Sequence, residues 1–120
     1  TSKSIEKNDS SGKLIEFPLM TTTFLGKKIP ASGGFYLRTL PTKVIKNSLK
    51  NYQNENIPGC FYIHSWELTP EFMPKLDLPF KDKFVTYHNL DKAYPRMAEL
   101  LEIFEFTSFN RYIAENKMDT

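Results

Sequence analysis

Apolar residues recur at helical spacing in two stretches of the chain. The first predicted helix starts at Pro41, through its fixed φ, or at Thr42, by capping, and lysine and asparagine side chains occupy its opposite face. Its apolar face contains Val44, Ile45, Leu49 and Tyr52. A second helix is predicted from Asp91, a favourable N-cap residue, with Pro95 in its first turn. Its predicted buried face contains Tyr94, Met97, Ala98, Leu101 and Phe104.

Short apolar runs predict strands between these helices and before them. Leu14–Leu19 forms the first strand, and Pro18 restricts it to a sheet edge or to its own end. Met20–Ile29 can form another strand, with Gly26 and two lysines making a turn. Cys60–His64 follows the first helix. The order strand, helix, strand favours parallel neighbours joined by a right-handed crossover, so the sequence predicts an α/β fold.

Polar and proline-rich stretches separate the predicted elements. Thr1–Gly12 has nothing to bury, which predicts a flexible lead-in or a surface loop. Paired glycines in 30–34 predict a loop, and three prolines in Leu68–Lys83 make regular structure there unfavourable. The aromatic residues of 105–109 are expected to pack back on the domain. The predicted organisation is a flexible lead-in over 1–13, one domain over 14–109 and a fraying tail over 110–120.

Composition limits the class of protein. The 120 residues are 40% hydrophobic and 14% aromatic, which fits one small domain. Sixteen basic and fourteen acidic side chains leave a net charge of +2, too near balance for nucleic-acid binding. No stretch approaches the roughly 18 uninterrupted apolar residues of a membrane span. The first residues lack an initiator methionine and a signal-peptide pattern, so we expect a processed product or a fragment of a longer protein.

The run Phe61–Glu67, FYIHSWE, contains the strongest candidate for chemistry. His64 interrupts an apolar, aromatic strand near its end, where α/β folds place functional groups. Imidazole titrates near neutral pH and suits acid or base catalysis, although a buried histidine that bonds a neighbour is an equally common explanation. Glu67 is predicted to orient His64 or to cap a loop. The single cysteine, Cys60, is interpreted as a small buried hydrophobe rather than a nucleophile.

Several short strings, in order, resemble the C-terminal part of bacterial polysaccharide deacetylases of the exopolysaccharide-locus type. The matching strings are Leu14–Leu19 with Phe24–Pro30, the segment GGFYLRTLP over 33–41, Phe61–Pro70 and the segment YHNLD over 87–91. The sequence departs from the family's strings at Phe35, Ser65, Thr69 and Thr86. His88 stands where the family has an apolar residue, so we interpret it as a surface or packing residue.

The resemblance implies a metal-dependent hydrolase that removes acetyl groups from the N-acetylated sugars of a polysaccharide, on a distorted (β/α) barrel. This chain would be the C-terminal part of that barrel, with two main helices and several short strands. In such enzymes one aspartate and two histidines hold a divalent metal, usually zinc, and a second aspartate is the base. A histidine near the end of the chain donates a proton to the departing amine, and His64 matches that position.

Three further residues are candidates for substrate binding. Arg38 follows the glycine pair and is expected to reach a sugar hydroxyl, a carboxylate or a partner aspartate. The alternative for Arg38 is an ordinary surface salt bridge, which contributes about 0 to 1 kcal/mol. Tyr36 and Trp66 can stack on a pyranose face, or they can pack in the core or at its rim.

The motifs that carry the family's metal ligands and base are absent from this sequence. His64 and His88 lie too far apart for a local two-histidine metal site. We therefore expect no cofactor in this chain, no activity of the chain alone, and a partner in the N-terminal part of the same enzyme, which would hold the metal. The apolar faces of an incomplete barrel predict self-association. The alternative function is a non-catalytic carbohydrate-binding or assembly module, and the compartment, bacterial cytoplasm or cell envelope, is left open.

Overall fold

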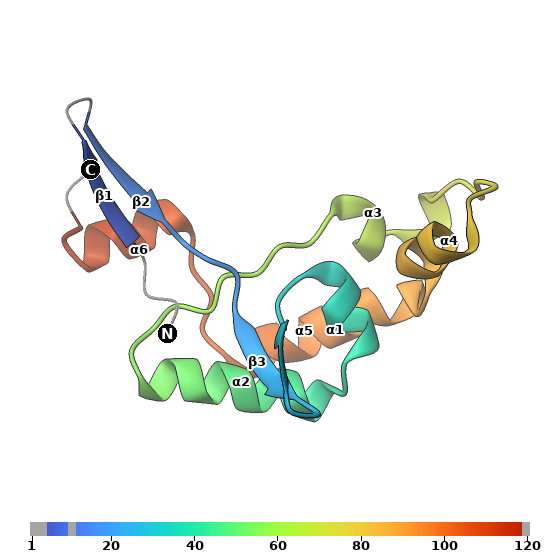
Figure 1. The fold of residues 1–120 in the computed structure, drawn as a ribbon, viewed down its shortest axis with the longest axis horizontal. Coiled ribbons are helices and arrows are strands. Elements are labelled where there is room, and N and C mark those ends of the chain that lie inside the picture. The colour runs from blue at the N-terminus through green and yellow to red at the C-terminus, as the bar shows by residue number, and fades with distance from the viewer. Residues whose placement is uncertain (1–4, 10–11, 119–120) are drawn as a thin grey trace.

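The structure is a computed structural model and describes residues 5–9 and 12–118. Two β-hairpins and a set of short helices make up this part of the chain (Figure 1). The strands are β1 (Ile5–Asp9), β2 (Gly12–Glu16), β3 (Thr21–Phe24) and β4 (Lys27–Pro30). The α-helices are α1 (Gly34–Thr39), α2 (Thr42–Asn54), α3 (Ser65–Leu68), α4 (Phe80–Tyr87), α5 (Ala93–Ile103) and α6 (Phe109–Glu115), and the 3-10 turns are η1 (Pro70–Phe72) and η2 (Leu90–Lys92). The prediction of a mixed helix and strand fold is confirmed.

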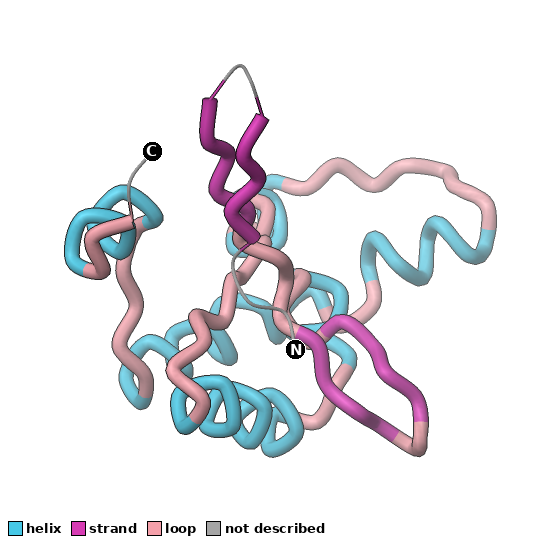
Figure 2. The backbone as a smooth tube through the Cα atoms, turned by 60° about the vertical axis from the view of Figure 1, so that its left-hand side comes forward, coloured by secondary structure: helices cyan, strands magenta, loops and turns pink. Residues whose placement is uncertain are grey.

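Each hairpin is a separate antiparallel pair (Figure 2). In the second hairpin, Leu25 and Gly26 connect β3 to β4 with positive φ angles of 49° and 74°, as a tight two-residue hairpin turn requires. The predicted turn at Gly26 is therefore confirmed, and it splits the predicted Met20–Ile29 strand into two.

The first hairpin lies where a flexible lead-in or a surface loop was predicted. Its strands pair from Ile5 opposite Glu16 to Asp9 opposite Gly12. The prediction of a loop was wrong because it relied on the lack of apolar side chains to bury. Backbone hydrogen bonds hold the two strands together without such side chains.

Parallel contacts between strand-like segments are limited, within the described residues, to two isolated bridges. Leu19 is bridged to Cys60, and Gly33 to Tyr62. The N–H of Tyr62 donates to the carbonyl of Ser32 at 3.0 Å, and the N–H of Gly34 donates to the carbonyl of Tyr62 at 2.9 Å. The predicted parallel neighbours thus exist as single contacts along an extended segment, and the barrel implied by the resemblance stays a prediction.

One apolar core joins β3, β4, α1, α2 and α5. Its buried residues are Met20, Ala31, Leu37, Leu40, Ile45, Leu49 and Leu100. Half-buried residues that pack against it include Phe24, Ile29, Tyr36, Tyr52, Phe61, Ile63, Met97, Phe104 and Phe106. The core therefore draws on elements far apart in the sequence, and the helices depend on it because short helices are marginal alone.

Helix α2 confirms the first predicted helix, and its buried residues include Ile45 and Leu49. Pro41 occupies the N-cap position with φ of −56°, and no side chain caps the helix, so Thr42 starts it without the predicted capping bond.

Helix α5 confirms part of the predicted buried face, since Met97 and Phe104 pack against the core. Ala93 and Leu100 are buried, whereas Tyr94 and Leu101 are 65% and 53% exposed. Arg96 lies on the inward side and donates to backbone carbonyls of α1. The prediction was wrong for Tyr94 and Leu101, because the apolar pattern excluded a polar residue from the buried face.

Three segments are more helical than predicted. Helix α1 falls in a stretch for which no element was predicted, and α4 begins inside the predicted proline-rich loop, of which 73–79 has no regular structure. Helix α6 replaces the predicted fraying tail. Ser108 caps α6 by accepting the N–H of Arg111, and Arg111 pairs with Glu115 one turn later. The predicted aromatic closure is confirmed, since Phe106 packs on the core and Phe109 stacks on Phe17.

The chain is more extended than a closed domain of its length. Its Cα radius of gyration is 16.3 Å, against roughly 13 to 14 Å for a compact domain of this size. Helix α4 and the loop before it project from the rest of the chain (Figures 1 and 2).

We expect Leu100→Ala to lower the free energy of unfolding by about 2 to 5 kcal/mol, because it leaves a cavity in the core. The matched variant Leu101→Ala should change it by less than about 0.5 kcal/mol, because that side chain is half exposed. Urea denaturation measures both values. Equal destabilisation by the two variants would contradict the orientation of α5.

Candidate functional site

The site is built on the extended segment 60–64, whose side chains alternate between two faces. Phe61 and Ile63 pack against the core, so Tyr62 and His64 point outward, and Tyr62 is 56% exposed. His64 is not at the end of a regular strand, as predicted, but occupies the N-cap position of α3. Its side chain is 46% exposed.

Glu67 holds His64 from inside the protein. The backbone N–H of His64 donates to Oε2 of Glu67 at 2.9 Å, and Nδ1 of its ring lies 3.3 Å from the same oxygen. The Glu67 side chain is 3% exposed. Glu67 therefore does both things that the sequence left open, because it caps the start of α3 and orients the imidazole.

Arg38 binds the other oxygen of this carboxylate. Its Nε and one terminal nitrogen lie 3.1 Å from Oε1 of Glu67, and its side chain is 1% exposed. Two ions removed from water are tolerated only where their remaining hydrogen-bonding groups are satisfied. The guanidinium meets this condition at the C-terminal end of α4, where it donates to the carbonyls of Val85 at 2.9 Å and His88 at 2.6 Å.

A second arginine fixes the helix that carries Arg38. One terminal nitrogen of Arg96 donates to the carbonyls of Leu37, Arg38 and Leu40 at 2.9 to 3.0 Å. The amide of Asn89 donates to the carbonyl of Arg38 at 3.1 Å. Helices α1, α3, α4 and α5 are thus linked through charged groups around Glu67, and none of the buried side-chain nitrogen and oxygen atoms in the described ranges lacks a partner.

The guanidinium of Arg38 is fully occupied by protein groups, so it does not present a surface to a sugar. Of its predicted partners, a carboxylate is the one that the structure provides, and it belongs to Glu67. The alternative of an ordinary surface salt bridge is wrong because the pair is buried.

The two aromatic candidates lie in different places. Tyr36 is half buried and packs against the core, with its ring 5.5 Å from that of Phe35 in an edge contact. Trp66 is half buried beside His64, and the two rings stack with centroids 5.4 Å apart. Of the two, Trp66 is part of the site around His64.

Sequence reasoning missed Tyr62. Its hydroxyl oxygen lies 3.0 Å from Nε2 of His64, and the two rings meet edge to face at 4.8 Å. The signal was present in the sequence, because residues two apart in an extended segment lie on the same face. His88, interpreted as a surface or packing residue, stacks on Phe84 with centroids 4.4 Å apart.

In the described part of the chain, no three His, Cys, Asp or Glu side chains come together as a possible metal-ligand set. Cys60 is half buried, and burial raises the pKa of its thiol. A raised pKa keeps the thiol protonated and weakly nucleophilic near neutral pH, which favours the interpretation of Cys60 as a packing residue.

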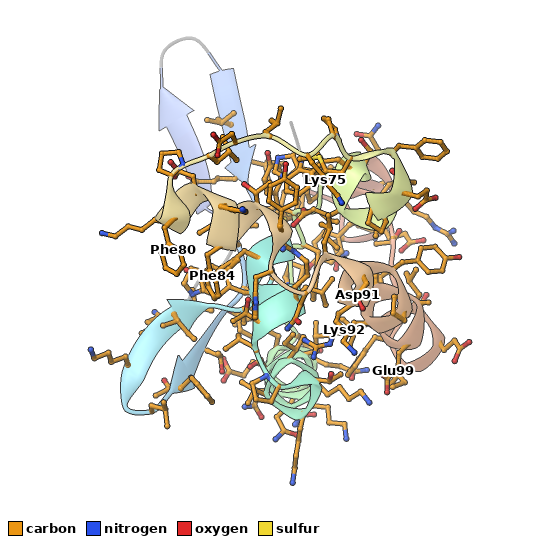
Figure 3. All side chains as sticks on the ribbon, turned by 90° about the vertical axis from the view of Figure 1, so that its right-hand side faces the viewer. Lys75, Phe80, Phe84, Asp91, Lys92 and Glu99 are labelled. Atoms are coloured by element: carbon orange, nitrogen blue, oxygen red, sulfur yellow. The ribbon has the colours of Figure 1, made fainter. Side chains whose placement is uncertain are left out.

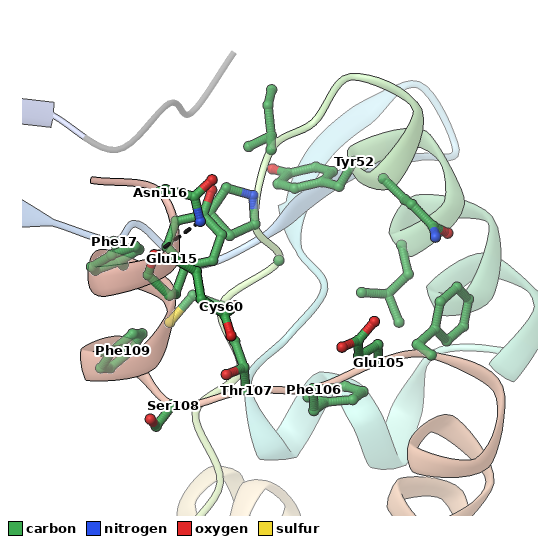
Figure 4. Close-up of a pocket in the computed structure, with 17 residues that line it drawn as sticks. Phe17, Tyr52, Cys60, Glu105, Phe106, Thr107, Ser108, Phe109, Glu115 and Asn116 are labelled. Atoms are coloured by element: carbon green, nitrogen blue, oxygen red, sulfur yellow. Dashed lines mark hydrogen bonds between the residues drawn. The ribbon is translucent and has the colours of Figure 1, made fainter. Parts of the chain in front are cut away.

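A pocket of about 390 Å³ lies on another part of the molecule, between the end of α2, residues 57–60 and α6 (Figure 4). Aromatic side chains, among them Phe17, Phe106 and Phe109, line it together with Cys60. His64 does not line this pocket. The pocket is therefore separate from the site around His64.

Comparison with known sequences gives one match. The chain matches the family described as a domain of unknown function (DUF3473) over residues 1–114. A search of curated proteins and a search of solved structures each gave no match. None of the helices within the described ranges has the length and apolar character needed to cross a membrane.

Gly34 gives a test of the Glu67 geometry, because a Cβ atom at this position would overlap the Glu67 carboxylate. We expect Gly34→Ala to destabilise the protein by about 1 to 3 kcal/mol, since the buried carboxylate cannot move without losing Arg38. Gly33→Ala is the matched control, because a Cβ atom there meets only the Tyr36 ring at an ordinary 3.6 Å. Thermal unfolding compares the two, and equal stability would contradict the close approach.

Proposed function

The chain belongs to the DUF3473 family, and from this premise we propose that it is the C-terminal segment of a polysaccharide deacetylase. The DUF3473 domain is known as the C-terminal part of polysaccharide deacetylases. In this proposal the chain supplies His64 as the general acid for hydrolysis of N-acetyl groups on a polysaccharide.

The observation that carries the proposal is the environment of His64. A general acid needs one face open to the substrate and an orientation fixed from behind. The ring is half exposed, its Nδ1 faces the buried Glu67 carboxylate, and its Nε2 lies on the side of the exposed Tyr62. An imidazole held in this way can deliver a proton from Nε2 to a nitrogen that leaves as an amine.

Glu67 and Arg38 act on His64 from the protein interior. A carboxylate beside Nδ1 fixes the orientation of the ring, so that Nε2 faces the side on which the proton is donated. Arg38 keeps that carboxylate in place by binding its other oxygen. We therefore assign Arg38 a positioning role, in place of the direct substrate contact predicted from the sequence.

The described residues do not fit the metal site of such an enzyme. We assign the metal, with the attacking water, to the N-terminal part of the same enzyme, and we derive no step through it. Trp66 beside His64 is the aromatic residue we propose for stacking on a sugar ring, because a pyranose presents an apolar face. Tyr36 packs on the core instead.

We expect His64→Ala, made in the enzyme that contains this chain, to lower kcat by about 10²- to 10⁴-fold, the usual contribution of a general acid. Metal content should stay unchanged. Deacetylation of N-acetylglucosamine oligomers and metal analysis measure the two effects.

His88→Ala is the control for this experiment, because that ring is half buried against Phe84, and it should leave kcat near the wild-type value. Loss of metal from the His64 variant would make His64 a ligand. Full activity of that variant would instead favour the alternative, a non-catalytic carbohydrate-binding or assembly module.

The projecting arm, residues 70–87, carries exposed apolar side chains that favour contact with a partner. Phe80 and Phe84 lie one turn apart on α4 (Figure 3), and Phe80 is 85% exposed. Phe72 and Leu76, in η1 and the loop before α4, are also exposed. Large exposed apolar groups favour contact with another surface. We propose that the rest of the enzyme covers this arm.

Without that cover, the isolated chain should self-associate through the arm. Sedimentation velocity on a concentration series should show oligomers, and Phe80→Ser should shift the population toward monomer. Leu25→Asn is the control, since it removes an exposed apolar side chain at the tip of the second hairpin. A clean monomer at all concentrations would contradict this prediction.

A further inference from the structure

Tyr62 occupies the side of His64 on which the proposed chemistry takes place. Its hydroxyl is 3.0 Å from Nε2, the ring nitrogen that does not face Glu67. Its backbone is fixed on both sides by the bonds to Ser32 and Gly34. The position of the hydroxyl therefore follows from the bridge that ties the segment 60–64 to the start of α1.

The carboxylate of Glu67 determines which ring nitrogen carries the proton in neutral His64. An ionised carboxylate only accepts hydrogen bonds, so the nitrogen facing it, Nδ1, is the one that carries hydrogen. Nε2 is then left with a lone pair. The hydroxyl of Tyr62 can donate to that lone pair.

A hydroxyl has a property that few other side-chain groups share, since it both donates and accepts. When His64 is neutral, the Tyr62 hydroxyl donates to Nε2. When His64 gains a second proton, Nε2 carries hydrogen and the same hydroxyl oxygen accepts it. Tyr62 can therefore partner Nε2 in both protonation states, whereas phenylalanine could do so in neither.

We infer that Tyr62 is a positioning residue that holds His64 Nε2 at the open edge of the site in both protonation states. The inference rests on the proposed function for its consequence, which is that the substrate nitrogen takes the place of the Tyr62 hydroxyl at Nε2 when it receives the proton, since this ring nitrogen carries one hydrogen. Trp66 stacks on the ring of His64, so the imidazole is held by contacts at Nδ1, at Nε2 and across one face.

The first test needs no enzyme activity. Nitrogen-15 NMR of this 120-residue chain, labelled on histidine and recorded above neutral pH, reports which ring nitrogen carries hydrogen. We expect the signal of a protonated Nδ1 and a bare Nε2 for His64. In Tyr62→Phe the Nε2 resonance should shift while Nδ1 stays protonated. A protonated Nε2 in the wild-type chain would overturn the inference whatever the variant does.

The second test uses the enzyme that contains this chain. Tyr62→Phe should lower kcat about tenfold with KM unchanged, because the imidazole is no longer held with Nε2 at the open edge of the site. Tyr94→Phe is the matched control, because Tyr94 is an exposed tyrosine on α5, and its kcat should not change.

The two proposals fail in different ways. If His64→Ala keeps full activity, the proposed function is wrong. If His64→Ala is inactive but Tyr62→Phe has wild-type kcat and an unshifted Nε2 resonance, only the role of Tyr62 is wrong.

Discussion

The buried ion pair between Arg38 and Glu67 connects the fold of this chain to its candidate site. Both side chains are almost fully removed from water. Such a pair adds little stability over an apolar pair of similar size, yet loss of one partner strands a buried charge and costs about 3 to 5 kcal/mol. The pair therefore requires its surroundings to be in place, namely the end of α4 for Arg38 and the start of α3 for Glu67. His64 is oriented by Glu67, which Arg38 holds in place.

Arginine side chains do the linking that a sheet does in many α/β folds. The described strands form two separate hairpins, and parallel contact is limited to two bridges. Arg38 binds carbonyls at the end of α4, and Arg96 binds carbonyls at the end of α1. Helix ends leave carbonyl groups unsatisfied, and a guanidinium with several donors can satisfy them while joining two helices. The close approach at Gly34 completes this network, because a side chain there would overlap the Glu67 carboxylate.

The interior fixes one side of His64 and leaves the other open. Phe61 and Ile63 anchor the segment in the core, and Tyr62 and His64 point outward. The openness of the site agrees with the extended shape of the chain and with the exposed side chains of α4. Both properties suit a segment that meets another part of an enzyme, which is the arrangement that we propose.

The sequence by itself determined the helix α2 and the turn at Gly26, because these depend on local spacing and local backbone preference. Short strings in order also carry the resemblance on which the proposed function rests. The tertiary structure alone decided that Arg96 lies on the inward side of α5, because its carbonyl partners belong to a distant helix. It alone decided that Arg38 binds Glu67, 29 positions further along the chain. Local periodicity carries no information on such long-range polar contacts, since they exist only after the helices have packed.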